Sequence, residues 1–338
     1  MRLLQLLLPL LLLARREAQQ LVPFEDLRAR LQRGDVAAAP AEDLTQRAIF
    51  LHIPKTGGTT FNKDVHFRKA KRYGISFAQF ETTQGNEQCL SSFDTEGKTL
   101  LMLVRDPRTH VLSEFMHCAT SNAKGAPLRR QRFNDTRRRL GKTPFPTTSN
   151  STYTLYDSFD EWVSWYIDAR GGGDDARLVQ PLGEEERFDF CYTPINLQTY
   201  ALVGSGSNHV QTPEEVERLW NQQFADTLRR AREAAASFHW VGLLEYYQQS
   251  ICMLHFTLYR RAAPYCDCRN PRSWKAFHPD HDRHGVRPHS IHQVAAATLR
   301  KVDRITRADR ALYEELKADF FRRAARYEAA AGGKLLCD

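Results

Sequence analysis

Three short apolar runs stand out from the more polar sequence around them and predict the strands of a buried sheet. They cover Ala48–Ile53, Leu100–Val104 and His239–Leu244. Runs of this length without strict alternation are typical of strands that are covered on both faces. Longer segments with helical spacing separate them. Strands that alternate with helices indicate an α/β fold with a mainly parallel central sheet.

The hydrophobic spacing predicts helices after each of these runs. We expect helices over residues 59–73, 108–119, 212–236, 246–260 and 291–330, the last with a break near Thr306. Two capping boxes, Ser158–Glu161 and Thr212–Glu215, predict the starts of helices. In such a box the Ser or Thr side chain accepts from the backbone N–H of the Glu, and the Glu side chain accepts from the backbone N–H of the Ser or Thr.

The chain divides into a leader, a stem and one main domain. Leu3–Ala14 is an apolar run of the length of a signal-peptide core, so residues 1–18 are predicted to be a signal peptide or, if uncleaved, a short single-pass membrane anchor. Residues 19–47 have the composition of a charged stem. The main domain covers residues 48–331, and residues 122–152 are predicted to be a basic surface insertion with loop-like composition.

Two kinds of residue favour the secretory pathway. Asn134 and Asn150 each begin an Asn-x-Thr acceptor for glycosylation, within the polar insertion. The seven cysteines allow up to three disulfides in an oxidising lumen, in pairings that the sequence leaves open. Cys266 and Cys268 lie too close together for the usual zinc pair, so a structural role is expected. A Golgi location, in the lumen or at the membrane, is the expectation.

Composition narrows the class of partner. Hydrophobic residues make up 42% and charged residues 26%, which is globular composition. Lys and Arg number 48 against 40 Asp and Glu, so the net charge is +8, which favours anionic partners. Seven Lys or Arg lie in residues 129–142, a stretch that either holds an anionic glycan or forms a solvated face.

The strongest chemical signal is the segment IPKTGGTT at residues 53–60, directly after a predicted strand and at the start of a predicted helix. Adjacent glycines let a ligand approach the backbone closely, and the N–H groups of a helix start attract an anion. Lys55 adds a positive charge. The order differs from the Walker pattern, in which the lysine follows the glycines, and this argues against an ordinary nucleotide kinase.

A second signal follows the second predicted strand. Arg105 lies where that strand ends, and Ser113 lies two turns along the next helix. Ligands in open α/β sheets bind at the carboxyl ends of the strands, and an arginine with a serine can hold a phosphate. The alternative is that Arg105 forms an ion pair with Asp106 or another neighbour, and that Ser113 is an ordinary helix residue.

Together these motifs resemble one enzyme family. FLHIPKTGGTTF is very similar to the donor loop of heparan sulfate 6-O-sulfotransferases, within the Golgi carbohydrate sulfotransferases that use 3′-phosphoadenosine-5′-phosphosulfate (PAPS), a family that includes the 2-O-enzymes. VRDPRTHVLSEF resembles the family's 3′-phosphate motif. WVGLLEYYQQSICMLHFTL and ITRADRALYEEL resemble its later strand–helix unit and C-terminal helix.

The resemblance implies a P-loop-like, three-layer α/β/α fold and transfer of a sulfuryl group from PAPS to a hydroxyl of a glycan, without a required metal. Lys55 would stabilise the leaving group as the catalytic cation. The residues that the resemblance assigns to the donor are Lys55, Thr56, Gly57, Gly58, Thr59, Thr60, Arg105 and Ser113. No nucleic acid partner is expected.

The catalytic base departs from the family pattern. The related enzymes place a histidine between the two donor motifs, whereas residues 74–100 contain none. Glu81 and Glu87 are therefore the preferred candidates and His66 is the third, since a carboxylate can act as a general base. Arg283, His284 and Gly285 are weaker candidates for a loop that closes over the donor. The clustered histidines of that segment are not expected to bind a metal.

The acceptor stays open between an anionic glycan, a neutral glycan and a protein tyrosine. A catalytically silent glycan-binding protein with the same fold is a further alternative. The presence of both Lys55 and Arg105 argues against that alternative.

Overall fold

The structure is a computed structural model. It describes residues 48–64, 77–78, 89–121, 126–139, 141, 144, 155–168, 176–179, 192–205, 211–259, 262–277, 279 and 286–337. The expected leader and stem lie outside these ranges. Within them, none of the helices combines the length and the apolar character that crossing a membrane requires.

The centre of the fold is a small parallel sheet. Its order is β2-β1-β3-β6, and every neighbouring pair is parallel. The strands are β1 (Ala48–Leu51), β2 (Phe77–Ala78), β3 (Thr99–Val104) and β6 (Trp240–Leu243). A separate antiparallel pair joins β4 (Ile167–Asp168) to β5 (Arg177–Leu178). The mixed α/β class and the parallel central sheet predicted from the three apolar runs are confirmed.

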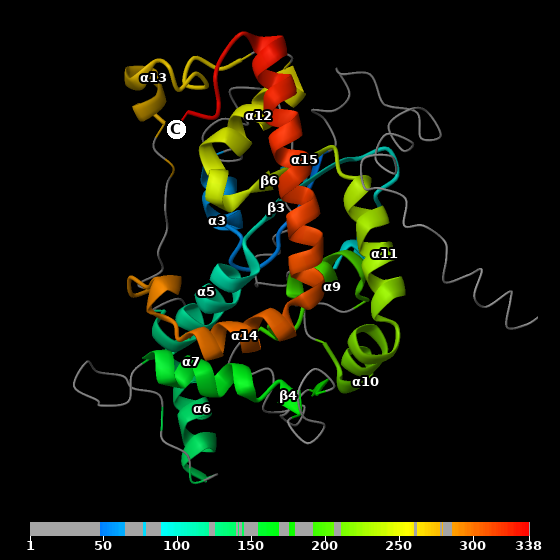
Figure 1. Ribbon diagram of the computed structural model, residues 1–338, viewed down its shortest axis with the longest axis vertical. Helices are drawn as coiled ribbons and strands as arrows, with labels where there is room; N and C mark the ends of the chain where they lie inside the picture. Colours follow the sequence, from blue (N-terminus) through cyan, green and yellow to red (C-terminus); the bar gives the residue numbers. More distant parts are fainter. Residues whose placement is uncertain are drawn as a thin grey trace, which may run out of the picture.

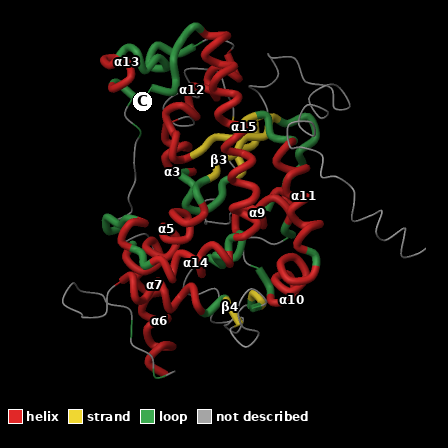
Figure 2. The backbone as a smooth tube through the Cα atoms, in the orientation of Figure 1, coloured by secondary structure: helices red, strands yellow, loops and turns green. Residues whose placement is uncertain are grey.

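Helices make up most of the described chain (Figure 2). They are α3 (Gly58–Phe61), α5 (Pro107–Thr120), α6 (Ala126–Arg139), α7 (Leu155–Ser164), α9 (Leu197–Val203), α10 (Pro213–Val216), α11 (Phe224–Ala236), α12 (Tyr247–Tyr259), α13 (Pro271–Lys275), α14 (Ala296–Ile305) and α15 (Arg307–Ala331). The expected break at Thr306 separates α14 from α15 and is confirmed.

Helices cover both faces of the sheet, because successive side chains of each strand point to opposite sides. Ile49, Met102 and Val241 pack with the buried faces of α9, α11 and α15. Phe50 and Leu101 pack on the other side with α3 and α12. Figure 1 shows α15 passing along the sheet with α11 beside it. The strands are therefore buried on both faces, which explains their continuous apolar sequence.

An aromatic stack fixes α3 to the sheet. The ring of Phe61 lies between Phe50, with centroids 4.1 Å apart, and Trp240, with centroids 5.6 Å apart. All three side chains are buried. Removing such a side chain costs about 3–5 kcal/mol of stability. The loop that precedes α3 is thereby held between a rigid strand and an anchored helix.

A second core joins α5, α7 and α14 below the sheet in the view of Figure 1. The rings of Phe115, Phe159 and Trp162 pack together at its centre. At its edge, the carboxylate of Asp160 on α7 accepts hydrogen bonds from Thr298 and Lys301 of α14. This core supports α5, the helix that follows β3.

Two expected helix starts had different outcomes. The capping box at Thr212–Glu215 is present and begins α10. However, the helix expected to continue to residue 236 is divided, because a π-helical turn over Glu217–Gln222 separates α10 from α11. The prediction that a helix begins at the Ser158–Glu161 capping box was wrong. α7 begins earlier, at Leu155, and Ser158 is buried inside it, where core packing fixes the helix.

The basic insertion is partly helical instead of loop-like. α6 occupies residues 126–139, since arginine and alanine are good helix formers. Asn134 lies on this helix, and its side chain is 5% exposed. The expectation that this acceptor lies in an open loop was therefore wrong for Asn134. The second acceptor, Asn150, lies outside the described residues.

Two disulfides tie α12 and the C-terminal segment to the loop around α13. They join Cys252 to Cys266 and Cys268 to Cys337, and Cys118 is also disulfide-bonded. The structural role expected for Cys266 and Cys268 is confirmed.

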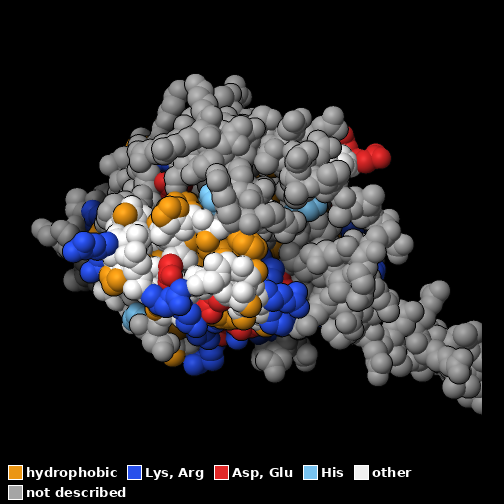
Figure 3. All heavy atoms as spheres, turned by 90° about the horizontal axis from the view of Figure 1, so that it is seen from above, with side chains coloured by type: hydrophobic (Ala, Val, Ile, Leu, Met, Phe, Trp, Pro, Cys, Tyr) orange, Lys and Arg blue, Asp and Glu red, His pale blue; other side chains and the backbone are white. Residues whose placement is uncertain are grey.

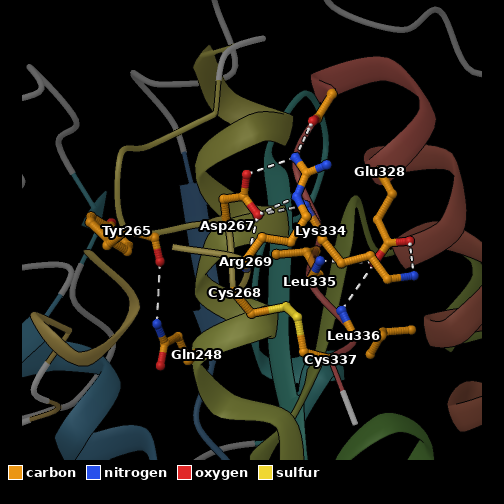
Figure 4. Close-up of a disulfide and its surroundings, with 11 residues drawn as sticks. Gln248, Tyr265, Asp267, Cys268, Arg269, Glu328, Lys334, Leu335, Leu336 and Cys337 are labelled. Atoms are coloured by element: carbon orange, nitrogen blue, oxygen red, sulfur yellow. Dashed lines mark hydrogen bonds and ion pairs between the residues drawn. A yellow bond between two sulfur atoms is a disulfide. The ribbon is translucent and has the colours of Figure 1, made fainter. Parts of the chain in front are cut away.

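Hydrogen bonds reinforce the second of these bridges (Figure 4). Arg269 pairs with the carboxylate of Asp267 and donates to the Gly332 carbonyl. Glu328 accepts from the backbone N–H groups of Leu335 and Leu336. The chain after α15 is thus fixed at that end of the molecule by covalent and polar contacts together.

Candidate functional site

The two sequence motifs lie at one edge of the sheet. β1 and β3 are adjacent and parallel, with Leu51 opposite Met102, so both strands deliver their following loops to the same side. This is the edge at which open α/β sheets bind ligands. The loop after β1 carries Lys55 and leads into α3, and the loop after β3 carries Arg105 and leads into α5.

The first loop is shaped by its backbone. Lys55 has a φ of 61° and Gly57 a φ of 91°, both in the left-handed region. A non-glycine residue there is uncommon and is found more often at functional sites. Thr56 is buried between them, and its hydroxyl donates to the Ile53 carbonyl over 2.9 Å. The Thr56 side chain therefore closes the turn, and the assignment of Thr56 to the donor stays a prediction.

Close packing favours glycine at residues 57 and 58. A Cβ atom on Gly58 would lie 1.9 Å from Cδ2 of His52. One on Gly57 would lie 2.5 Å from a methyl group of Leu244, in a backbone conformation that already favours glycine. The chain thus turns tightly at this point. Of the loop residues, Lys55, Gly57 and Thr59 are half-buried, whereas Gly58 and Thr60 are buried with Thr56.

Arg105 connects the two loops. Its Nη1 donates to the Lys55 carbonyl over 3.1 Å, and its Nε donates to the Thr109 hydroxyl over 3.1 Å. His110 makes a parallel contact, because its Nε2 lies 2.7 Å from the Pro54 carbonyl and a carbonyl can only accept. Residues of the second motif thereby hold the backbone of the first.

Burial lowers the pKa of the Arg105 guanidinium from its usual value, while the carboxylates of Glu245 and Asp106 act in the opposite direction. The group keeps its charge, since arginine does not lose its proton in proteins. Ser113 lies on α5 four residues after Thr109, on the same face of the helix, and is 6% exposed. Arg105 thus contacts Thr109, and Ser113 lies one turn further along the same face of α5.

A glutamine fixes the backbone of Arg105. Gln198, the second residue of α9, accepts from the Arg105 N–H and donates to the Arg105 carbonyl, each over 2.9 Å. The N-terminus of α9 is itself capped by Asp309, whose carboxylate accepts from the N–H groups of Gln198 and Thr199. Burial raises the pKa of Asp309 to about 6.

The opposite capping contact comes from Asn196. Its side-chain oxygen accepts from the N–H groups of Ala308 and Asp309, at the start of α15. The N-termini of α9 and α15 therefore cap each other. This buried joint connects the position of Arg105 to the C-terminal helix.

Acidic and phenolic groups complete the second loop. Asp106 caps α5 by accepting from the Thr109 N–H over 3.0 Å, and its own N–H donates to Glu245 over 2.8 Å. Tyr313 of α15 donates to the other oxygen of Glu245 over 3.0 Å. Burial, with Glu245 next in effect, raises the pKa of Tyr313 above its ordinary range. Tyr313 therefore acts as a hydrogen-bond donor at neutral pH.

The structure adds one residue that sequence reasoning had not assigned. His289 is half-buried, and its Nδ1 lies 2.8 Å from the Arg287 carbonyl. Burial, together with the positive charges of Arg105 and Lys55, lowers the pKa of His289. Both motifs thus act electrostatically on this imidazole, which is neutral at pH 7. Its only signal in the sequence was the cluster of histidines in a Pro-rich segment.

The proposed bases Glu81, Glu87 and His66 lie outside the described residues, as do Arg283, His284 and Gly285. Among the residues that the structure describes, no group of three or more His, Cys, Asp or Glu side chains is arranged to hold a metal ion. The described contacts of the site therefore join Lys55 to Arg105 and to their supports, and the positive charges of both residues act on His289.

Comparison with known proteins returns no match to a family model, a curated protein or a solved structure.

Proposed function

We propose that the chain is a PAPS-dependent sulfotransferase with a P-loop-like α/β fold. One observation carries the proposal: the guanidinium of Arg105 donates to the carbonyl of Lys55, 50 residues away in the chain. Sequence resemblance assigns these two motifs to opposite ends of one donor molecule. In the fold, this hydrogen bond joins them. The resemblance supplies the chemistry, and this contact supplies the proximity.

In this proposal the donor lies along the edge of the sheet. Lys55, Gly57 and Thr59 are the loop residues with exposed surface, so they are assigned to the 5′-phosphosulfate. Arg105 is assigned to the 3′-phosphate, with Ser113 beside it. A guanidinium suits this role, because it forms paired charge-assisted hydrogen bonds to phosphate oxygens.

The reaction moves one sulfuryl group. The acceptor hydroxyl oxygen forms a bond to sulfur, while the bond from sulfur to the bridging phosphate oxygen breaks. The products are a sulfate ester and 3′-phosphoadenosine-5′-phosphate (PAP), and the hydroxyl proton passes to a base. Lys55 stabilises the charge that grows on the bridging oxygen, an effect exerted mainly in the transition state.

Four residues are candidates for the base. Glu81, Glu87 and His66 come from the sequence. His289 comes from the structure, in which burial, together with the positive charges of Arg105 and Lys55, lowers its pKa. A base must be unprotonated when the acceptor binds, and positive neighbours keep an imidazole in that state. We favour His289 for the first test.

The proposed acceptor is a glycan hydroxyl, with protein tyrosine as the alternative, and the proposed location is the Golgi. Disulfides persist in oxidising compartments, and the pairs Cys252–Cys266 and Cys268–Cys337 fit that location. Incubating the luminal part with radiolabelled PAPS and a panel of neutral glycans, acidic glycans and tyrosine peptides identifies the acceptor class.

Calorimetry with nucleotides tests the donor site without an acceptor. PAP is expected to bind more tightly than ADP, because only PAP offers a 3′-phosphate to Arg105. Equal affinity for the two nucleotides contradicts the proposal. Arg272→Ala is a matched control, since this arginine is exposed on α13 and should leave both affinities unchanged.

A further inference from the structure

A buried histidine and a buried glutamate of α5 lie against the Lys55 loop. The Nε2 atom of His110 is 2.7 Å from the Pro54 carbonyl oxygen and 3.2 Å from Oε1 of Glu114. Because a carbonyl oxygen only accepts, the proton of a neutral His110 lies on Nε2. The carboxylate of Glu114, one turn further along α5, favours the same position, since it also accepts.

Glu114 is a fully enclosed carboxylate. Its side chain is 0% exposed, and that of His110 is 1% exposed. The intervening turn of α5 carries Val111 and Leu112, which belong to the second core with α7 and α14. An ionised carboxylate is costly in such a place unless donors or positive charges face it. Burial lowers the pKa of Arg105, and the negative charge of Glu114 is among those that act against this effect, so Glu114 is within reach of Arg105.

Carboxylates nearer the surface of the molecule are paired differently. Asp303 accepts two hydrogen bonds from Arg108, each over 2.7 Å, and lines a polar cavity of about 970 Å³ together with five arginines. On the face shown in Figure 3, at the end that carries α13, Asp and Glu side chains lie among those of Lys and Arg. Exposed pairs of this kind are weak, because water screens them. Glu114 differs from them in its complete burial and in its contact with a histidine.

The contact of His110 gains its importance from the peptide that it holds. The Pro54 carbonyl belongs to the peptide plane before the Cα atom of Lys55, and the Lys55 carbonyl belongs to the plane after it. His110 holds the first carbonyl, and Arg105 donates to the second over 3.1 Å. Fixing both planes fixes φ and ψ of the residue between them. Lys55 has a φ of 61°, a conformation that persists in residues other than glycine only where the surroundings hold it.

We propose that His110 and Glu114 are positioning residues for Lys55. Glu114 keeps the proton of His110 on Nε2, this N–H holds the Pro54 carbonyl, and the held peptide keeps Lys55 in its left-handed conformation. For its effect on turnover, the inference rests on the proposed function. It goes beyond the residues that were assigned to PAPS, because it gives a buried pair behind them the task of directing the lysine.

Two amide substitutions at residue 110 test the hydrogen bond. The side-chain NH2 group of glutamine reaches the place of Nε2, whereas that of asparagine reaches only the place of Nδ1, and both side chains are uncharged donors. Amide hydrogen exchange is measured on the full chain without ligand, for peptides from residues 53–61, β3 and α15. His110→Asn should speed exchange in residues 53–61 about 10-fold, the scale of one lost hydrogen bond, and His110→Gln should keep the wild-type rate.

The peptides from β3 and α15 separate positioning from a general loss of stability. Their exchange should not change in His110→Asn, and equal acceleration of all three peptides overturns the proposal. Equal rates in the Asn and Gln variants overturn it too. Glu114→Gln should also speed exchange in residues 53–61, and it should add nothing to His110→Asn, because Glu114 acts through His110. If His110→Asn does not fold, Glu114→Gln carries the test alone: acceleration confined to residues 53–61 supports the proposal, and any other pattern overturns it.

Turnover connects the pair to Lys55. His110→Asn should lower kcat about 10-fold, because the lysine is no longer held in place, while the Michaelis constant for PAPS changes little. His110→Gln should restore kcat. In the Lys55→Ala background, His110→Asn should cause no further loss, since a residue that acts through Lys55 has no effect once Lys55 is removed. A full further loss overturns the positioning role.

This inference and the proposed function fail separately. Hydrogen exchange requires neither PAPS nor an acceptor, and PAP binding is measured by calorimetry on the same samples. If the wild type does not bind PAP, the sulfotransferase proposal fails, and the exchange rates still decide whether His110 holds the loop. If PAP binds and the Asn and Gln variants exchange equally, the positioning assignment fails alone.

Discussion

The loops after β1 and β3 reach the same edge of the sheet, but they are held in different ways. The turn of the β1 loop is set by its own backbone, with left-handed conformations at Lys55 and Gly57, and Arg105 adds one hydrogen bond to the Lys55 carbonyl. The β3 loop depends on side chains from elsewhere. Gln198 clamps Arg105, and Glu245 accepts from the Asp106 N–H.

The two loops therefore differ in what fixes the position of their functional groups. A backbone-shaped loop presents N–H groups and one lysine in a fixed turn, which suits a group that must be bound and then released. A loop fixed by distant side chains couples its arginine to α9 and α15 through the Asn196–Asp309 joint. We therefore expect local substitutions to change the turn of the first loop. Substitutions far away in the chain, at Gln198 or Asn196, should mainly affect the second loop.

The largest expected effect comes from removing the lysine of the β1 loop. Lys55→Ala should lower turnover by roughly two to three orders of magnitude, the scale of one electrostatic group in the transition state. PAP affinity, measured by calorimetry, should change little. Lys275→Ala, exposed on α13, is the control. A change confined to the Michaelis constant for PAPS would make Lys55 a docking residue.

The next effect concerns His289, whose imidazole is influenced by the positive charges of Lys55 and Arg105. Because the pKa of His289 is lowered, the side chain is neutral above that pKa and charged below it. As a base, it should give a kcat/KM that rises with pH, through a value below the usual 6.5, and then levels. His289→Asn should lose about 100-fold in kcat and abolish this acidic limb. A variant that keeps the limb contradicts the assignment.

A smaller effect is expected from the arginine of the β3 loop. Arg105→Ala should weaken PAP binding by about 1.5–3 kcal/mol, the scale of a charged hydrogen bond, and raise the Michaelis constant for PAPS more than it lowers turnover. ADP affinity should fall less. An equal loss for PAP and ADP would show that Arg105 acts only by holding the Lys55 carbonyl.

The smallest effect tests the clamp itself. Gln198→Ala removes both hydrogen bonds to the Arg105 backbone and should cost about 1–3 kcal/mol in the free energy of unfolding, measured with urea. PAP affinity should fall only a few-fold, since the guanidinium remains. Gln222→Ala, at an exposed residue of the π-helical turn, is the control. Unchanged PAP affinity with lost stability would confine the clamp to a structural role.

The sequence predicted those parts of the site that depend on neighbouring residues. Apolar runs located β1, β3 and β6, and the two glycines located the turn that Gly57 makes with a positive φ. Gln198, Glu245 and Tyr313 were not predicted, because their partners lie tens of residues or more away in the chain and no local pattern records such contacts.

Errors in the helices have the same cause. Ser158 and Glu161 satisfy a local capping rule. However, Phe159 and Trp162 are buried in the core, and α7 already begins three residues before Ser158. The sequence did not predict that one cavity is lined by Arg177, Arg300, Arg304, Arg307 and Arg310. These residues come from β5, α14 and α15, and only folding brings them together. Local chemistry could be predicted, whereas shared surfaces could not.

The close approach of His52 to residue 58 restricts the order in which this loop can change over evolution. An alanine at residue 58 would place its Cβ 1.9 Å from the His52 imidazole, so the imidazole must move or residue 52 must first become smaller. In the opposite order, the intermediate carries the clash. Such pairs are non-additive, and a substitution that is harmful in one background is accepted in another. The glycine is thus maintained by a neighbouring histidine as well as by any ligand.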